Sequence, residues 1–143
     1  QGRMIEQLRK MLVRHEGLRL RPYKDSVGKL TIGVGRNLDD VGISESEAML
    51  LLSNDIGIAR SEAEKFVWFH KLDSVRQDVI VSMVFNMGLP RLLGFKNMLH
   101  AIEAGNWKAT AEEMLDSKWS RQVGKRAEEL ARMMITGEYR KDL

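Results

Sequence analysis

The chain has 143 residues, which is enough for one domain that buries roughly two-thirds of its unfolded surface. It contains no cysteine, so disulfides and thiolate chemistry are excluded, and this usage fits synthesis in a reducing cytoplasm. The formal net charge of +3 favours polyanionic partners, a class that includes both bacterial walls and nucleic acids. Charge alone does not separate these two partners.

Two further kinds of site are not expected. The three histidines show no metal-ligand spacing, and no apolar run approaches the ~20 residues that span a membrane. We therefore expect no metal and no stable membrane insertion by this chain. The chain starts at Gln1 rather than at a methionine, which is compatible with a signal or signal-anchor segment before it.

The first predicted element is an amphipathic helix over residues 4–16. Its apolar residues recur at three- and four-residue steps and predict one buried stripe, formed by Met4, Ile5, Leu8, Met11 and Leu12. Gly17 follows the last periodic residue and can adopt the left-handed conformation that closes a helix. Glu16 then lies in the last turn, facing the negative end of the helix dipole. That end disfavours an ionised carboxylate, as a general acid requires.

The next predicted element is a β-hairpin over residues 23–34. Its loop is Ser26-Val27-Gly28, with the glycine in the left-handed position of a bulged turn. With this loop length Asp25 pairs with Lys29, and Asp25 shares a face with Thr31, its diagonal neighbour at roughly 7–8 Å. A four-residue loop would break this arrangement.

The two faces of the second strand of this hairpin differ in character. The residues expected to point towards a core are Leu30, Ile32 and Val34. On the opposite face Gly33 and Gly35 follow Thr31. The Thr31 face is therefore predicted to be polar and almost bare, which suits close approach by a bulky ligand.

Glu16, Asp25 and Thr31 together are suited to cutting a glycosidic bond. One carboxylic acid protonates the leaving oxygen, and a second, ionised carboxylate activates water or attacks the sugar. Taken singly each residue is ordinary, because Asp is a standard turn residue and Thr is common in strands. Only their combination indicates catalysis.

These residues also carry a resemblance to a known family. The catalytic segment of the T-even-type bacteriophage lysozymes (glycoside hydrolase family 24) is similar to Glu16-Gly-Leu-Arg-Leu, Tyr23-Lys-Asp25, Gly28 and Thr31-Ile-Gly-Val-Gly. The resemblance covers nearly the whole chain, and downstream it rests on Leu72-Asp73-Ser-Val-Arg76, Met83-Val-Phe85-Asn-Met-Gly88, Gly94-Phe95, Asn97, Trp107, Ser117-Lys-Trp119, Gln122, Arg126-Ala and Thr136-Gly137. It implies that Glu16 is the general acid and that Asp25 and Thr31 hold the attacking water.

Two departures from the family pattern stand out. Where the family usually has His after the glycine-rich turn, this chain has Arg36, so the work of that His is done differently here. The connector from Asn37 to Ile43 is also shorter than in familiar members, which predicts a trimmed outer part of the small lobe.

Beyond the hairpin the sequence predicts helices only. Ser44-Glu-Ser-Glu47 has the form of a capping box and starts a long helix that runs to about Phe69. Asp73 is the predicted N-cap of a helix that ends at Gly88, and Leu89-Pro90 makes that break firm. Further helices are expected over residues 95–102, 107–115 and 127–135, the second of them capped by Asn106. The aromatic residues expected in the core are Trp68, Phe95, Trp107 and Trp119.

The expected fold class is α+β, mainly α, as a lysozyme-like two-lobe fold in a single domain over residues 1–143. We expect a small β-containing lobe over about residues 14–50. An α-helical lobe is expected from about residues 51–143 together with the N-terminal helix. A helix as long as the one predicted after Ser44 would tie the two lobes together.

The resemblance also implies substrate contacts. Phe85 precedes Asn86-Met-Gly88, where a helix end would border the cleft between the lobes, and the family has a substrate-contacting Phe at this position. The whole predicted substrate-binding set is Phe85, Asn37, Asn86, Met98, Glu113 and Arg126. Met98 and Glu113 differ in residue type from familiar members.

The sequence therefore predicts a lysozyme that cleaves the β-1,4 bond between N-acetylmuramic acid and N-acetylglucosamine in peptidoglycan, with the substrate identity implied by the resemblance. We expect an inverting, monomeric endolysin that needs no cofactor, does not bind nucleic acid and lyses bacteria at the end of a phage cycle. It would be made in the host cytoplasm and act on the cell wall, which lies in the periplasm of a Gram-negative host.

Two other interpretations stay open at this point. A basic helical module could bind nucleic acid or cell wall without catalysis, although aromatic residues are only 6% and do not interleave with the basic ones as stacking platforms would. The same fold could also have lost its activity and kept wall binding. The intact Glu16, Asp25 and Thr31 argue against that loss.

Overall fold

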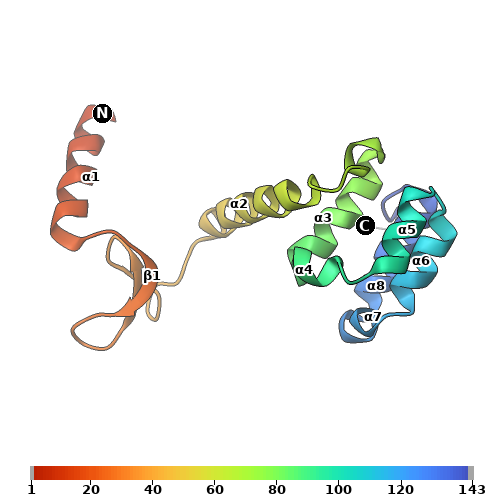
Figure 1. The fold of residues 1–143 in the computed structure, drawn as a ribbon. Coiled ribbons are helices and arrows are strands. Elements are labelled where there is room, and N and C mark those ends of the chain that lie inside the picture. Colours follow the sequence, from red (N-terminus) through yellow and green to blue (C-terminus); the bar gives the residue numbers. More distant parts are fainter. Residues whose placement is uncertain (1, 142–143) are drawn as a thin grey trace. The chain divides into compact units, whose positions relative to one another are not determined.

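The computed structural model of the chain describes residues 2–141 (Figure 1). Its elements in order are α1 (Gly2–Glu16), β1 (Arg19–Lys24), β2 (Leu30–Gly33), β3 (Arg36–Asn37), α2 (Glu45–Ala63), the 3-10 helix η1 (Phe69–Lys71), α3 (Ser74–Met87), α4 (Leu89–Leu92), α5 (Lys96–Glu103), α6 (Trp107–Leu115), α7 (Lys118–Val123) and α8 (Lys125–Thr136). The predicted α+β, mainly helical fold class is confirmed. Within residues 2–141, no helix has the length and apolar character that crossing a bilayer requires.

The chain forms two compact units, residues 1–51 and 52–143. The boundary falls inside α2, so the first turns of this helix belong to the N-terminal unit and the rest to the C-terminal unit. The N-terminal unit contains α1 and the three-stranded sheet, and the C-terminal unit contains the helices from η1 onwards.

The N-terminal helix α1 ends where the sequence predicts. Gly17 has φ +80°, and its N–H donates to the Val13 carbonyl at 2.8 Å, so it closes the helix directly after Glu16. The prediction of a buried stripe on α1 is not met within this unit. Met4, Ile5 and Leu8 remain 74%, 48% and 50% exposed.

The sheet is antiparallel throughout, in the order β1-β2-β3. The first strand starts at Arg19, four residues before the predicted start of the hairpin, and its register is irregular between Arg19 and Tyr23. Pro22 lies in this irregular stretch and has no N–H to donate to a neighbouring strand. The two-residue strand β3, absent from the sequence prediction, pairs Arg36 with Ile32 and makes β2 the central strand.

The expectation that Leu30, Ile32 and Val34 face a core is wrong for this unit. Leu30 is 37% exposed, Val34 is 38% exposed and Ile32 is half-buried. The physical reason is that the described residues of the N-terminal unit include no buried apolar side chain against which the sheet could pack. Among the described residues every fully buried apolar side chain lies between Ala59 and Met134, in the C-terminal unit.

The helix α2 is shorter than predicted, since it ends at Ala63 rather than near Phe69. After Ala63 the N–H groups of Lys65 and Phe66 bond to carbonyls three residues back, both at 3.1 Å, which replaces the helix with tight turns. Phe66 stacks on Trp68 with ring centroids 4.5 Å apart, and Phe69 is fully buried. No residue pattern indicates this helix end, because residues 58–69 contain neither Gly nor Pro.

The C-terminal unit holds the hydrophobic core. α6 packs against α5 and α8, and α3 also packs against α8 (Figure 1). The predicted caps Asp73 and Asn106 accept from the backbone N–H groups of Arg76 and Ala109, and Gly88 and Gly137 close α3 and α8. Trp68 and Trp119 are buried in the core as expected, with Phe95 and Trp107 packed against it. The short helices α4 and α7 were not predicted.

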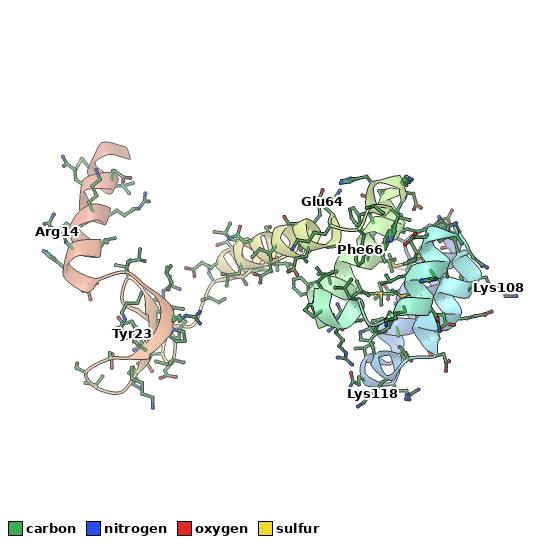
Figure 2. The ribbon with its side chains drawn as sticks, in the orientation of Figure 1. Arg14, Tyr23, Glu64, Phe66, Lys108 and Lys118 are labelled. Carbon is green, nitrogen blue, oxygen red and sulfur yellow. The ribbon has the colours of Figure 1, made fainter. Side chains whose placement is uncertain are left out.

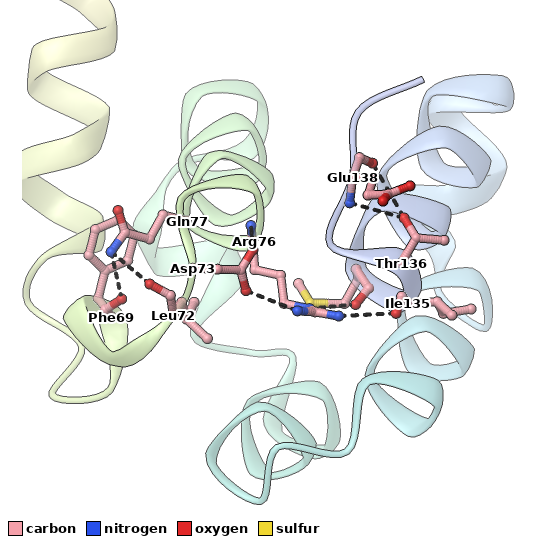
Figure 3. A network of polar contacts seen from close by, with 9 residues as sticks. Phe69, Leu72, Asp73, Arg76, Gln77, Ile135, Thr136 and Glu138 are labelled. Carbon is pink, nitrogen blue, oxygen red and sulfur yellow. Dashed lines mark hydrogen bonds and ion pairs between the residues drawn. The ribbon is translucent and has the colours of Figure 1, made fainter. Parts of the chain in front are cut away.

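One largely covered arginine side chain connects three parts of this unit. Arg76, near the start of α3, donates to the carbonyls of Met134 and Ile135 at the end of α8, at 2.7 and 3.0 Å, and to Asp73 Oδ1 at 2.9 Å (Figure 3). Its guanidinium also lies 4.3 Å from the centre of the Trp107 ring. α3, α6 and the end of α8 therefore meet at a single side chain.

Candidate active site

The Glu16 side chain contacts the turn before β3 at Gly35, a residue with no side chain. A Cβ added to Gly35 would lie 3.2 Å from Glu16 Oε2 and 3.5 Å from Cδ, so the carboxylate is seated against the bare Gly35 backbone. Gly35 also has φ +71°, a conformation that side chains rarely adopt. The turn before β3 thus requires glycine for two separate reasons. The end of α1 and this turn bring the predicted acid to the edge of the sheet.

Asp25 is fixed by its own loop. Its Oδ1 accepts from the backbone N–H groups of Val27 at 3.0 Å and Lys29 at 2.8 Å, while its backbone N–H donates to the Lys29 carbonyl at 2.9 Å. Gly28 has φ +86°, so the predicted three-residue loop and the pairing of Asp25 with Lys29 are confirmed. Within the described part of the chain, Oδ2 accepts no hydrogen bond, which leaves this oxygen available to hold a water molecule.

Thr31 lies where the register was predicted to put it, opposite Tyr23 and diagonal to Asp25. The prediction that its face is bare is wrong at this residue, because Thr31 is only 3% exposed. Tyr23 on β1 (Figure 2) and Asn37 on β3 pair with it from either side, and the missed third strand accounts for the burial. The Thr31 hydroxyl donates to the Lys29 carbonyl at 2.9 Å, and its oxygen accepts no hydrogen bond from the residues that the structure describes.

Arg36 makes contacts that explain the departure from histidine at this position. Its two Nη atoms donate to the two carboxylate oxygens of Glu47, at 2.8 and 2.7 Å, and Nη1 also donates to the Gly42 carbonyl at 3.0 Å. Ser44 completes the predicted capping box, since its N–H donates to Glu47 Oε1 at 2.8 Å and its Oγ accepts from the Glu47 N–H. The Arg36 hydrogen bonds, followed by those from Ser44, lower the pKa of Glu47 to about 2.

Comparison with known proteins covers most of the chain. The sequence model of the phage lysozyme family matches residues 13–133. Probable T4-type lysozyme 1 from Dictyostelium discoideum is 30% identical in an alignment that covers 94% of this chain and 96% of that protein. The chain belongs to the phage lysozyme family.

Some further relatives of the chain come from bacteriophages. The SAR-endolysin of Escherichia phage Mu is 25% identical over 95% of this chain and 84% of its own length. The pre-baseplate central spike protein Gp5 of Enterobacteria phage T4 is 28% identical over 89% of this chain, but the match covers 27% of that protein. The family identifies the chain as a lysozyme-type peptidoglycan hydrolase, a glycosidase whose substrate is the cell wall.

The predicted residues of this lysozyme divide between the two units. Glu16, Asp25, Thr31 and Asn37 lie in the N-terminal unit, and the other predicted substrate contacts lie in the C-terminal unit. The Asn37 side chain makes two hydrogen bonds with Asp40 in the turn that follows β3. Its Nδ2 donates to Asp40 Oδ2 and its Oδ1 accepts from the Asp40 N–H, both at 3.0 Å.

The predicted substrate contacts of the C-terminal unit differ in how much surface they present. Phe85 is 44% exposed on α3 and is the most available of them for stacking. Asn86 Oδ1 accepts from Trp119 Nε1 at 2.7 Å, and Arg126 donates weakly to the Ser82 carbonyl and hydroxyl. Met98 is only 1% exposed, so it belongs to the core and offers almost no surface to a sugar. Glu113 is half-buried and lines, with Met98, a surface pocket of about 330 Å³.

Sequence reasoning missed the functional meaning of two contacts. The Arg36–Glu47 pair is eleven residues apart, and only the capping box at Ser44 hinted that Glu47 has a fixed orientation. The bond from Trp119 to Asn86 joins residues 33 apart and has no local signal. Both depend on tertiary structure that the spacing of residues does not encode.

Proposed function

We propose that this lysozyme cleaves the β-1,4 glycosidic bond between N-acetylmuramic acid and N-acetylglucosamine in peptidoglycan and thereby lyses bacteria. The observation that carries the proposal is the state of Asp25, whose Oδ1 is held by two backbone N–H groups while its Oδ2 accepts no hydrogen bond from the described residues. Membership of the phage lysozyme family supports the choice of substrate. The chain is proposed to act as a single-domain monomer on the cell wall, after synthesis in the host cytoplasm.

Glu16 acts as the general acid in this proposal. It lies in the last turn of α1, and its carboxylate rests against the Gly35 backbone at the turn before β3. As the glycosidic C–O bond breaks, Glu16 transfers its proton to the leaving oxygen and becomes ionised. The anomeric carbon then carries oxocarbenium-like positive charge.

Asp25 activates the water that attacks this carbon. The free Oδ2 accepts a proton from the water as the new C–O bond forms on the opposite face of the sugar, and the Thr31 hydroxyl oxygen helps to hold that water. The backbone N–H groups on Oδ1 hold the Asp25 carboxylate in a fixed orientation. Because the attack comes from the face opposite the leaving group, the product anomer is inverted.

Substitution of each carboxylate tests the proposal. Glu16→Gln and Asp25→Asn should each lower the rate of wall lysis by at least ~10²-fold, the lower range for loss of a positioned acid or base. Asparagine keeps an oxygen acceptor at Oδ1, so the loop should survive and circular dichroism should stay native. Glu45→Gln, an exposed acid at the start of α2, is the matched control and should lyse walls at the wild-type rate.

The stereochemical outcome is a separate test. A water between Asp25 and the sugar requires carboxyl groups ~6.5–9.5 Å apart and yields an inverted product. Proton NMR of the first-formed reducing end identifies the anomer. A retained β-anomer would show that a covalent glycosyl-enzyme forms instead. Loss of turbidity from a peptidoglycan suspension, with no retardation of DNA in a gel, separates this function from nucleic-acid binding.

A further inference from the structure

The Glu16 carboxylate rests on a short turn with little intrinsic rigidity. Gly33 and Gly35 both have φ +71°, and glycine loses more conformational freedom on folding than any other residue. The carboxylate lies within van der Waals reach of Gly35, as the 3.2 Å separation between Oε2 and an added Cβ shows. Any movement of this turn would therefore move the backbone surface that positions the carboxylate of the proposed acid.

Arg36, the residue directly after this turn, is held by three side-chain hydrogen bonds. Arg36 makes the two parallel bonds of a bidentate pair with Glu47 and a third bond to the Gly42 carbonyl. Glu47 is itself fixed by Ser44 in the first turn of α2. Arg36 therefore ties the glycine turn to a helix start that is already capped.

The chemistry of this contact requires arginine. A planar guanidinium can present two parallel N–H donors to a carboxylate and still direct one of them to a carbonyl. Lysine concentrates its charge on one nitrogen, and the two ring nitrogens of histidine point in different directions. Other ion pairs of this unit, such as Arg9–Glu6 and Lys29–Asp40, make one hydrogen bond each, both of 3.2 Å.

We propose that Arg36 is a positioning residue for the glycosidase reaction. By holding Glu47 and the Gly42 carbonyl, it fixes the turn from Gly33 to Arg36 and so the surface against which the Glu16 carboxylate rests. The inference rests on the proposed role of Glu16 as the general acid. Arg36 touches neither the substrate nor Glu16 in this scheme, and acts through Gly35.

The test compares Arg36→Gln with Arg9→Gln, which removes an exposed single-bond ion pair from the same unit. We expect kcat for Arg36→Gln to fall about 10-fold to 10²-fold with KM within about twofold, because a misplacement of about 1 Å can cost ~10²-fold in rate. Arg36→Lys should lie between Arg36→Gln and wild type. Arg9→Gln should keep the wild-type kcat.

A readout independent of activity comes from carbon-13 NMR of side-chain carboxyl groups in glutamate-labelled protein. The Glu16 resonance is assigned by its absence from Glu16→Gln. It should move in Arg36→Gln and stay in place in Arg9→Gln. If Arg36→Gln does not fold, Glu47→Gln weakens the same bidentate pair while leaving Arg36 on the Gly42 carbonyl.

The outcomes separate this inference from the proposed function. A wild-type kcat or an unmoved Glu16 resonance in the folded variant overturns the positioning role of Arg36, even where Glu16→Gln is inactive. An equal loss in Arg9→Gln overturns it too, because the effect would then be general to the unit. Full activity of Glu16→Gln overturns the proposed function itself.

Discussion

Replacing Arg76 with methionine should destabilise the C-terminal unit strongly. The arginine side chain is only 13% exposed and donates to two carbonyls that end α8 (Figure 3). Methionine keeps most of the apolar stem but removes both donors and the charge. The carbonyls of Met134 and Ile135 then lose their hydrogen-bond donor. They lie at a helix end, where the last four C=O groups have no intrahelical partner.

The magnitude follows from these contacts. Hydrogen bonds to a charged group contribute about 1.5–3 kcal/mol each, and the cation–π contact with Trp107 adds about 0.5–2 kcal/mol. The ion pair with Asp73, whose side chain is 43% exposed, adds little. Because water can partly satisfy the carbonyls and the terms are not additive, we expect a loss of about 3 kcal/mol in the free energy of unfolding, or roughly 10 °C in Tm.

Urea and thermal unfolding, followed by circular dichroism, measure this loss. Arg121→Met is the matched control, since Arg121 is exposed on α7 and should change stability by no more than about 0.5 kcal/mol. Arg76→Lys keeps the positive charge but not the planar set of N–H donors, and should recover less than half of the lost free energy of unfolding. If Arg76→Met loses under about 1 kcal/mol, or Arg76→Lys matches wild type, directed bonding to the end of α8 is not what Arg76 contributes.

Three further predictions concern single side chains. The pKa of Glu47 is lowered from its ordinary value near 4.5 to about 2. The ionised Glu47 therefore stabilises the folded state above pH 4.5, and this contribution is lost as the pH falls towards 2. The Tm difference between wild type and Glu47→Gln should shrink between pH 7 and pH 2.5. The hydrogen bond to Asp78 raises the pKa of Tyr139 to about 12, so ultraviolet titration should show one of the two tyrosines ionising above pH 11, and Tyr139→Phe should remove that late step. Glu16→Gln should melt at or above the wild-type temperature at pH 7, because it removes a carboxylate from the negative pole of α1; a clearly lower Tm would make Glu16 a structural partner.

The local features of the site were predictable from the sequence. The loop from Ser26 to Gly28 and the pairing of Asp25 depend on residues within a few positions of one another. The closure of α1 by Gly17 is equally local. In each case one glycine with positive φ and a short spacing determine the backbone, so sequence patterns are sufficient.

The predictions that failed concern features that depend on contacts between distant segments. The burial of Thr31 follows from β3, a strand of two residues that is too short to leave a pattern. The early end of α2 follows from the burial of Phe69 in the core, which overrides a helical sequence. The partner of Arg36 could not be chosen in advance, because several acidic residues follow it within a dozen positions.

Asp25 has a structural role in its loop as well as its proposed catalytic role, which limits the substitutions that this position can accept during evolution. The same carboxylate that is proposed to activate water also holds the loop through Val27 and Lys29. Alanine would lose both tasks, and glutamate would carry its oxygens one methylene beyond the two N–H groups. Of these three replacements asparagine keeps the loop acceptor, and a single-base change in either aspartate codon produces it. At position 25, a single base change therefore separates the proposed enzyme from a folded descendant that lacks its proposed base.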